Sequence, residues 1–213
     1  MKFTVKRSSM FAALLLGICA ASSFAANEKT DYKVGERLPK GTATTVPSSA
    51  TYKPLNWDEL LPSDWDPMKP FKGLNLDTLK DSDPRASEAM EKVREAWNNA
   101  PIVSALNGTR VKIPGFVVPL DIDRHKVKEF LLVPYFGACI HVPPPPANQI
   151  IHILTTKSLT DEQNDMLKKA LLLQGAVFVS GILETVPTNT DMGFAGYNMK
   201  VEVIEPYKAP ESK

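Results

Sequence analysis

From Gly108 onward the chain alternates apolar runs with turn residues, and this order constrains the fold more than any other feature of the sequence. Five runs have the length and composition of strands, and one amphipathic segment stands between the third and the fourth. The predicted strands are 109–120, 129–142, 147–156, 176–186 and 197–205, and the predicted helix is 159–173. These are the ingredients of an OB-type barrel, so we predict a mostly β (α+β) domain of OB-like architecture. A small open sheet with helices on one side is the alternative.

Local signals inside these elements support the same division. Thr160 or Ser158 can cap the predicted helix, and Gln163 completes a capping box with Thr160. Pro114 and Gly115 interrupt the first predicted strand, where they indicate a bulge or a tight bend. The elements are therefore expected to begin and end close to the limits given above.

The first 25 residues have the pattern of a secretion signal. A basic start is followed by a short apolar core over 10–21, and small residues at Ser23 and Ala25 predict cleavage after Ala25. The apolar core is too short to span a bilayer comfortably, and no later segment is long and apolar enough to do so. We therefore expect an exported protein located in the periplasm.

The remainder is expected to form one domain with an N-terminal extension. Residues 26–50 are polar and lack apolar periodicity, which predicts a flexible leader. Residues 51–101 are expected to be an arm that packs on the domain and includes a helix. The domain itself is predicted over 102–206, followed by a tail at 207–213 that is expected to fray.

The arm contains large apolar residues that can anchor it and residues that can begin a helix. Its large apolar side chains are expected to fill grooves on the domain: these are Trp57, Leu60, Leu61 and Trp65. A helix is predicted to follow, because Asp83 can cap it and Pro84 can occupy its first position. The apolar period of the helix continues to about Asn98.

Charge and cysteine content narrow the function classes. The formal net charge of +1 falls to −2 when the three basic residues of the signal are removed, and no basic stripe follows. Nucleic acids and anionic membranes are therefore not expected as partners. Cys19 leaves with the signal, so Cys139 remains alone in an oxidising compartment. It is expected to be buried, bound to metal, used in redox chemistry or paired with another chain.

Cys139 and His141 lie in a run that ends in four prolines. Residues two apart in an extended strand point to the same side, so a thiol and an imidazole would lie next to each other. His152 on the following predicted strand would approach them across a hairpin. Cys139, His141 and His152 therefore form a candidate metal site for zinc, or for copper. His125 lies in a polar turn and is left outside the site.

Other interpretations of the same residues remain open. Cys139 can be a buried small hydrophobe, and His152 can be a core histidine bonded to a backbone carbonyl. His141 can activate Cys139 as a nucleophile, but the context of a thiol hydrolase is lacking and we predict no enzymatic activity. The prolines can be a rigid spacer or a recognition surface, and Asn148 and Gln149 are expected to hydrogen-bond loop carbonyls or site residues.

The motifs also resemble an exported proteobacterial domain family of unknown function. The resemblance rests on 113–120, 130–149, 181–184 and 195–197, and it covers roughly 102–206, with the Cys-Ile-His-Val-Pro-Pro-Pro-Pro core as its most specific part. Some members are encoded beside ABC-type transporter components and zinc-binding periplasmic proteins. The resemblance therefore implies an accessory role in metal handling or transport, with Cys139, His141 and, less directly, His152 as site residues. A non-catalytic interaction module is the alternative.

Overall fold

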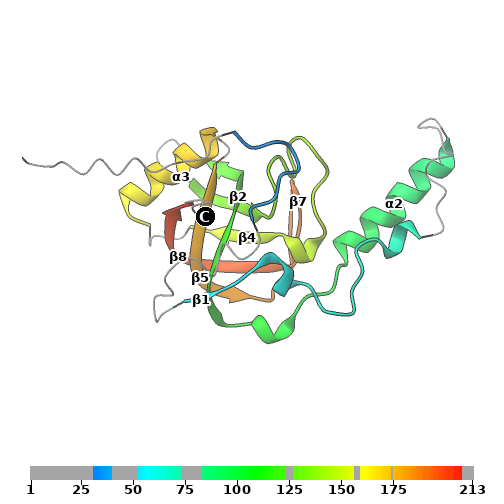
Figure 1. Ribbon diagram of the computed structural model, residues 1–213, viewed down its shortest axis with the longest axis horizontal. Coiled ribbons are helices and arrows are strands. Elements are labelled where there is room, and N and C mark those ends of the chain that lie inside the picture. Colours follow the sequence, from blue (N-terminus) through cyan, green and yellow to red (C-terminus); the bar gives the residue numbers. More distant parts are fainter. Residues whose placement is uncertain are drawn as a thin grey trace, which may run out of the picture.

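The computed structural model describes residues 31–39, 52–72, 83–122, 127–155, 159–173 and 175–207. Within these residues, five strands close into a barrel (Figure 1). In barrel order they are β2 (Thr109–Ile122), β3 (Val127–Val133), β4 (Ile151–Leu154), β8 (Tyr197–Pro206) and β5 (Ala176–Glu184). β5 pairs back with β2, and the β4–β8 pair is parallel whereas the other pairs are antiparallel. This order defines an OB-type barrel and excludes the open sheet.

The helix α3 (Asp161–Leu173) lies between β4 and β5 in the chain, as predicted. The side chain of Thr160 accepts a hydrogen bond from the Gln163 backbone N–H at 3.2 Å, and the Gln163 side chain accepts one from the Thr160 N–H at 3.0 Å. These reciprocal bonds are the predicted capping box. A hairpin of β6 (Thr188–Thr190) and β7 (Gly193–Ala195) follows β5 and was not predicted.

β2 pairs with two neighbours, first with β5 and then with β3. Its register with β5 is continuous through Pro114 and Gly115, so the bulge expected there is absent; the irregularities lie between Pro119 and Ile122. Gly115 is required for packing, because a Cβ at this position would lie 2.7 Å from Leu132 Cγ and 3.0 Å from the Trp57 ring. The glycine therefore lets the arm approach the barrel wall.

Three predicted strands are longer than the real ones, and the one predicted over 176–186 is too long by only two residues. β3 ends at Val133, and the expected strand over 129–142 is wrong beyond that point because Pro134 supplies no N–H and the chain then turns. β4 begins at Ile151, after the short 3-10 turn η5 (Ala147–Gln149). Cys139 and His141 therefore belong to a loop between β3 and β4 and not to a strand.

Apolar side chains form one cluster inside the barrel and one on its outside. The inner cluster takes residues from all five barrel strands together with Leu167 and Ala170 of α3. The outer cluster takes residues of the opposite parity, among them Phe116, Leu131 and Ile150. The wall formed by β2, β3 and β4 is thus buried on both faces, which explains its almost continuous apolar sequence.

The first part of the arm belongs to the inner cluster. β1 (Lys53–Pro54) pairs in parallel with β2, and η1 (Trp57–Leu60) follows it. Leu60 is fully buried, the Trp57 Nε1–H donates to the Pro114 carbonyl at 2.7 Å, and the Tyr197 hydroxyl donates to the Leu60 carbonyl at 2.8 Å. This part of the arm completes the core of the barrel.

The second part of the arm leaves the barrel. η2 (Lys69–Phe71) and α2 (Pro84–Asn98) form a projecting lobe in Figure 1, and η4 (Ser104–Leu106) leads back to β2. The Asp83 side chain accepts a hydrogen bond from the Arg85 N–H at 2.9 Å, and Pro84 begins the helix, as predicted. α2 therefore has the expected limits, but it does not lie along the barrel.

Residues 31–39, which we name the strap, lie on the outer cluster of the barrel (blue in Figure 1). This differs from the flexible leader expected over 26–50, because Tyr32 and Leu38 of the strap are buried. The predicted signal with Cys19, His125 and the end of the predicted tail lie outside the described residues. Within the described part of the chain, no helix is long and apolar enough to cross a membrane.

Candidate functional site

The loop that holds Cys139 and His141, which we name the Cys loop (residues 135–142), is a compact turn. The Gly137 carbonyl accepts hydrogen bonds from the backbone N–H groups of Ile140 at 3.2 Å and His141 at 2.8 Å. Gly137 has a φ of 80° and Cys139 a φ of 64°, so the backbone reverses direction here. The expected arrangement of Cys139 and His141 on one face of a strand is therefore wrong.

Cys139 is a free, half-buried thiol that packs on the outer cluster. Burial raises its pKa from the ordinary value of 9.0 to about 11. The pKa of the neighbouring Tyr135 rises to about 12, first through burial and then through the charge of Cys139, while Arg37 acts in the opposite direction. Near neutral pH the side chain of Cys139 is therefore a thiol and not a thiolate. A thiol is a poor nucleophile and a poor metal ligand.

His152 is held in a polar cluster on the outer face of the wall. Its Nε2 lies 2.5 Å from Glu129 Oε1 on β3, and its Nδ1 lies 2.9 Å from Asn198 Oδ1 on β8. Asn198 Oδ1 in turn accepts a hydrogen bond from the Thr188 hydroxyl at 3.0 Å. Both ring nitrogens are occupied, so His152 joins three barrel strands and the β6–β7 hairpin.

The candidate metal site is therefore not assembled. His152 lies opposite Leu131 in the β3–β4 pair, and its ring nitrogens face Glu129 and Asn198. Within the described ranges, no group of three or more His, Cys, Asp or Glu side chains is arranged to hold a metal ion. Zinc sites in proteins are usually four-coordinate, so Cys139 and His141 alone would leave such a site incomplete.

Asn148 and Gln149 bind loop carbonyls, which is one of their two predicted uses. The Asn148 Nδ2 donates to the Pro101 carbonyl at 2.9 Å, and the Gln149 Nε2 donates to the Trp57 carbonyl at 2.9 Å. Both side chains are buried. They fix the end of the proline run against the arm, so the prolines hold a defined position.

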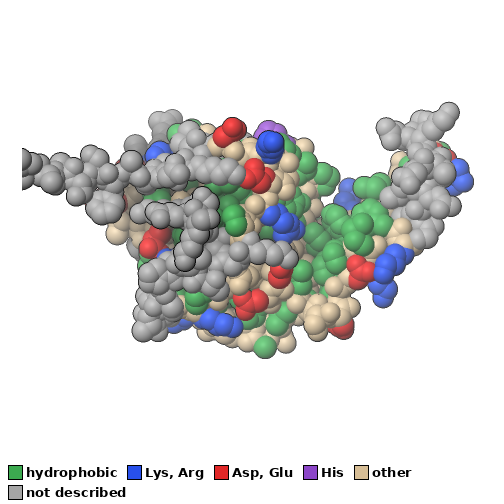
Figure 2. Space-filling view, in the orientation of Figure 1, with side chains coloured by type: hydrophobic (Ala, Val, Ile, Leu, Met, Phe, Trp, Pro, Cys, Tyr) green, Lys and Arg blue, Asp and Glu red, His purple; other side chains and the backbone are tan. Residues whose placement is uncertain are grey.

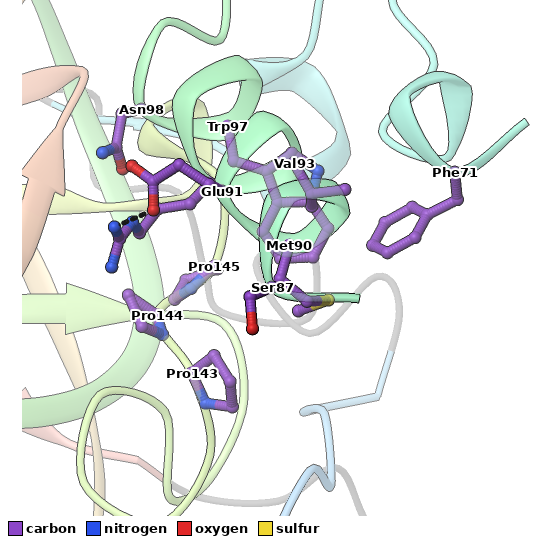
Figure 3. Close-up of a pocket in the computed structure, with 11 residues that line it drawn as sticks. Phe71, Ser87, Met90, Glu91, Val93, Trp97, Asn98, Pro143, Pro144 and Pro145 are labelled. Carbon is purple, nitrogen blue, oxygen red and sulfur yellow. Dashed lines mark hydrogen bonds and ion pairs between the residues drawn. The ribbon is translucent and has the colours of Figure 1, made fainter. Parts of the chain in front are cut away.

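An apolar groove lies between this proline run and α2 (Figure 3). Its cavity volume is about 520 Å³. One wall is Pro143–Pro145, and the opposite wall is a face of α2 that includes Met90, Val93 and Trp97, with Phe71 of η2 at its edge. Figure 2 shows hydrophobic side chains gathered where the α2 lobe meets the barrel. The volume and the apolar lining are typical of a binding site.

The groove is formed by firmly held side chains, and none of the described residues fills it. The Trp97 ring packs edge-on against Phe71 at 5.7 Å between ring centroids, and its Nε1–H donates to the Pro67 carbonyl at 3.0 Å. Met90, in contrast, is 51% exposed. The charged lining residues, Glu91 and Arg94, form an ion pair with each other. The groove thus offers an apolar surface without net charge.

Sequence reasoning missed this groove. Met90 and Trp97 fall within the apolar period of the predicted helix, and the sequence alone leaves the prolines as either a rigid spacer or a recognition surface. One feature of the sequence could have indicated the groove: the chain contains both a run of four prolines and an amphipathic helix with exposed apolar residues. Their proximity depends on the path of the arm, which local patterns do not determine.

Comparison with known proteins identifies the family. A model of the family described as "Protein of unknown function (DUF3299)" matches residues 57–206. The crystal structure of a DUF3299 family protein from Pseudomonas aeruginosa is 34% identical in sequence, with a TM-score of 0.52, and the match covers 73% of this chain and 96% of that chain. The chain therefore belongs to the DUF3299 family. The family match begins at Trp57, so the arm, which the sequence resemblance had left outside, is part of the family domain.

Other solved structures are similar at a lower level. An asparaginyl-tRNA synthetase from Pyrococcus horikoshii is 16% identical over 50% of this chain and 21% of that chain, with a TM-score of 0.31. An OBody bound to hen egg-white lysozyme is 15% identical over 51% of this chain and 89% of that chain, with a TM-score of 0.30. Among curated proteins, none matches the chain. The OB-type assignment rests on the strand order of the barrel itself.

Proposed function

We propose that this protein is a non-catalytic docking module of the periplasm, and that the groove between α2 and Pro143–Pro145 binds an apolar segment of a partner protein. The observation that carries the proposal is the open groove itself, with Met90 exposed on one wall and the prolines held rigidly on the other. Exposed apolar surface of this kind is typical of interaction sites in soluble proteins.

The chemistry of the groove favours a neutral apolar segment. Glu91 and Arg94 neutralise each other, so a charged ligand would find no counter-charge in the lining. Trp97 and Phe71 supply rigid aromatic surface, which contributes strongly to binding energy at protein interfaces. An apolar segment with one or two large side chains fits both the volume and the lining.

The competing functions of the Cys loop receive less support. A zinc or copper site would need a further ligand beyond Cys139 and His141, since His152 is engaged by Glu129 and Asn198. A thiol enzyme would need a thiolate, and the raised pKa of Cys139 opposes one. The expected association with ABC-type transporter components is retained here as the proposed source of the partner segment.

Site-specific photo-crosslinking in cells that produce the protein tests the proposal. A benzophenone amino acid is introduced into the full chain at Ser87 or Met90 in the groove, or at Glu88, an exposed control on the same helix outside the lining. Irradiation is expected to join a second protein to positions 87 and 90 but not to position 88. The adduct is identified by mass spectrometry, and thermal unfolding checks that each variant is folded.

Three outcomes would contradict the proposal. These are no adduct at positions 87 and 90, equal adducts at all three positions, and adducts formed exclusively with a second copy of this chain. In a further control, a Met90→Glu substitution places a charge in the groove and is expected to reduce crosslinking from position 87.

A further inference from the structure

Part of the outer face of the barrel wall is covered by the strap, which contacts Phe116 of β2 and Phe136 of the Cys loop. In OB folds the exposed face of the second and third barrel strands is a common ligand surface, and here those strands are β3 and β4. This face carries Leu131 and Ile150, which are fully buried in the structure. The strap, which is distant from this face in the sequence, helps to bury it.

The strap occupies the face through two side-chain anchors. The Tyr32 ring meets Phe116 edge-on at 4.8 Å and stacks on Phe136 at 5.9 Å between ring centroids. Leu38 enters the same outer cluster six residues later, and both anchors are less than a tenth exposed. The residues between them are exposed apart from the half-buried Glu36, and the Arg37 guanidinium lies over the Tyr135 ring at 5.5 Å from its centroid. The strap therefore binds in the manner of a short peptide with two anchor residues.

Backbone pairing adds to these anchors. The Gly35 N–H donates to the Phe136 carbonyl at 2.9 Å, and the Phe136 N–H donates to the Glu36 carbonyl at 2.9 Å. Gly35 has a φ of 83°, and the Glu36 N–H donates to the Lys33 carbonyl at 2.8 Å, so the strap reaches the Cys loop as a tight turn. These main-chain bonds join the strap to the Cys loop in a short antiparallel pair, and main-chain bonds are a common source of affinity for peptides.

We propose that the outer face of β2, β3 and β4 is a peptide-binding site that the strap fills within its own chain, and that the strap exchanges with a partner segment of the same chemistry. That segment carries an aromatic residue, a turn and then an apolar residue. The apolar lining of the face favours an apolar peptide over an oligonucleotide, which is bound mainly through a basic groove that follows its backbone. The site is separate from the α2 groove and goes beyond the proposed function.

The strap is suited to exchange because only a few side-chain and backbone contacts fix it to the barrel. It contributes two buried side chains, whereas the arm contributes fully buried Leu55 and Leu60 to the inner core. Segments with few buried apolar contacts open at lower free energy than core elements. Opening of the strap would expose Phe116 and Phe136, the ring partners of Tyr32, and would release the Cys loop, which carries Cys139.

The test uses the full chain with Cys19→Ala, so that Cys139 is the only thiol, and compares it with a variant that also carries Tyr32→Ala and Leu38→Ala. The variant is expected to react with Ellman's reagent about tenfold faster or more, because the loss of two buried anchors favours the open state. A fluorescent peptide of strap residues 31–39 is then expected to bind the variant saturably and to slow the reaction of Cys139 again.

Two controls define the result. The same peptide with alanine at both anchor positions is expected not to bind, and the Cys19→Ala chain with its own strap in place is expected to bind the natural peptide at least about tenfold more weakly than the variant does. Circular dichroism checks that the variant is folded, and if it is not, Leu38→Ala alone is used with the same measurements. Unchanged thiol reactivity, absence of peptide binding, or binding of a single-stranded oligonucleotide in place of the peptide would overturn the proposal.

Discussion

The outer barrel face and the α2 groove are both apolar surfaces, but the first is covered by another segment of the chain and the second is exposed. The barrel face is covered by the strap, whose anchors Tyr32 and Leu38 are 8% and 9% exposed. In the groove, Met90 is 51% exposed. The Cys loop pairs with the strap, and the prolines that follow it form a wall of the groove. The connection between β3 and β4 therefore contributes both to the barrel face covered by the strap and to the exposed α2 groove.

This difference separates two kinds of apolar residue that look alike in the sequence. Leu60 and Met90 both belong to the arm, but Leu60 completes the barrel core whereas Met90 faces solvent in the groove. Burial therefore predicts which substitutions change stability and which change binding. The following predictions test this division, from the largest expected effect to the smallest.

Replacing Leu60 with alanine is expected to lower the free energy of unfolding by about 2–5 kcal/mol, because it leaves a cavity in the barrel core. Met90→Ala, the matched change in the same arm, is expected to alter it by about 0.5 kcal/mol or less. Urea unfolding followed by circular dichroism measures both values. Similar losses for the two variants would show that the arm is not divided in this way.

Replacing His152 with leucine is expected to lower the free energy of unfolding by about 1–3 kcal/mol. The substitution removes the partner of Glu129 and of Asn198 within a largely covered cluster. Glu129→Gln, which keeps a hydrogen-bonding group at that position, is expected to cost less. Chemical unfolding of the three proteins gives the comparison.

The same variant addresses the metal hypothesis. Zinc or copper bound to the native state would raise the unfolding midpoint, and above saturation this rise would grow with the logarithm of the metal concentration. We expect no such shift in the wild-type protein when zinc is added. A zinc-dependent rise that disappears in the His152→Leu variant would show that His152 is a metal ligand. It would contradict the arrangement in which Glu129 and Asn198 occupy both ring nitrogens.

The last prediction concerns Cys139 and is a weak dependence of stability on alkaline pH. Its pKa is 9.0 in an ordinary environment and about 11 in the folded protein, so the unfolded chain loses the thiol proton first. The stabilising contribution is therefore complete below pH 9 and is lost as the pH rises towards 11. Because the thiol is only half-buried, we expect a contribution of about 1 kcal/mol or less.

The measurement compares the wild-type protein with Cys139→Ser at several pH values between 8 and 11. Tyrosines and lysines titrate in both proteins, so the difference between the two curves isolates the thiol. A difference that stays constant with pH would mean that the Cys loop leaves the thiol as exposed in the folded protein as in the unfolded chain.

Local signals predicted the secondary structure best. Asp83 and Pro84 fix the start of α2, and Thr160 with Gln163 fixes the start of α3, because each signal acts within one turn of helix. The order of apolar runs was sufficient for the barrel type. The two helices and the barrel type could therefore be predicted from the sequence.

The candidate site was harder to predict because it depends on contacts between distant segments. The parity argument for Cys139 and His141 assumed a regular strand, whereas the left-handed backbone at Gly137 and Cys139 turns the chain. The partners of His152 depend on the register of β3 and β8 against β4. The groove depends on the direction in which α2 leaves the barrel, which no short-range pattern encodes.

The position of β8 has a consequence for how the molecule is made. This strand comes last in the barrel, yet it lies between β4 and β5, with a parallel partner on one side. During synthesis the barrel cannot close until residues 197–206 have left the ribosome, so the strands made earlier wait for a partner that arrives late. Such a delay would suit the periplasmic location proposed above, because secretion channels thread unfolded chains.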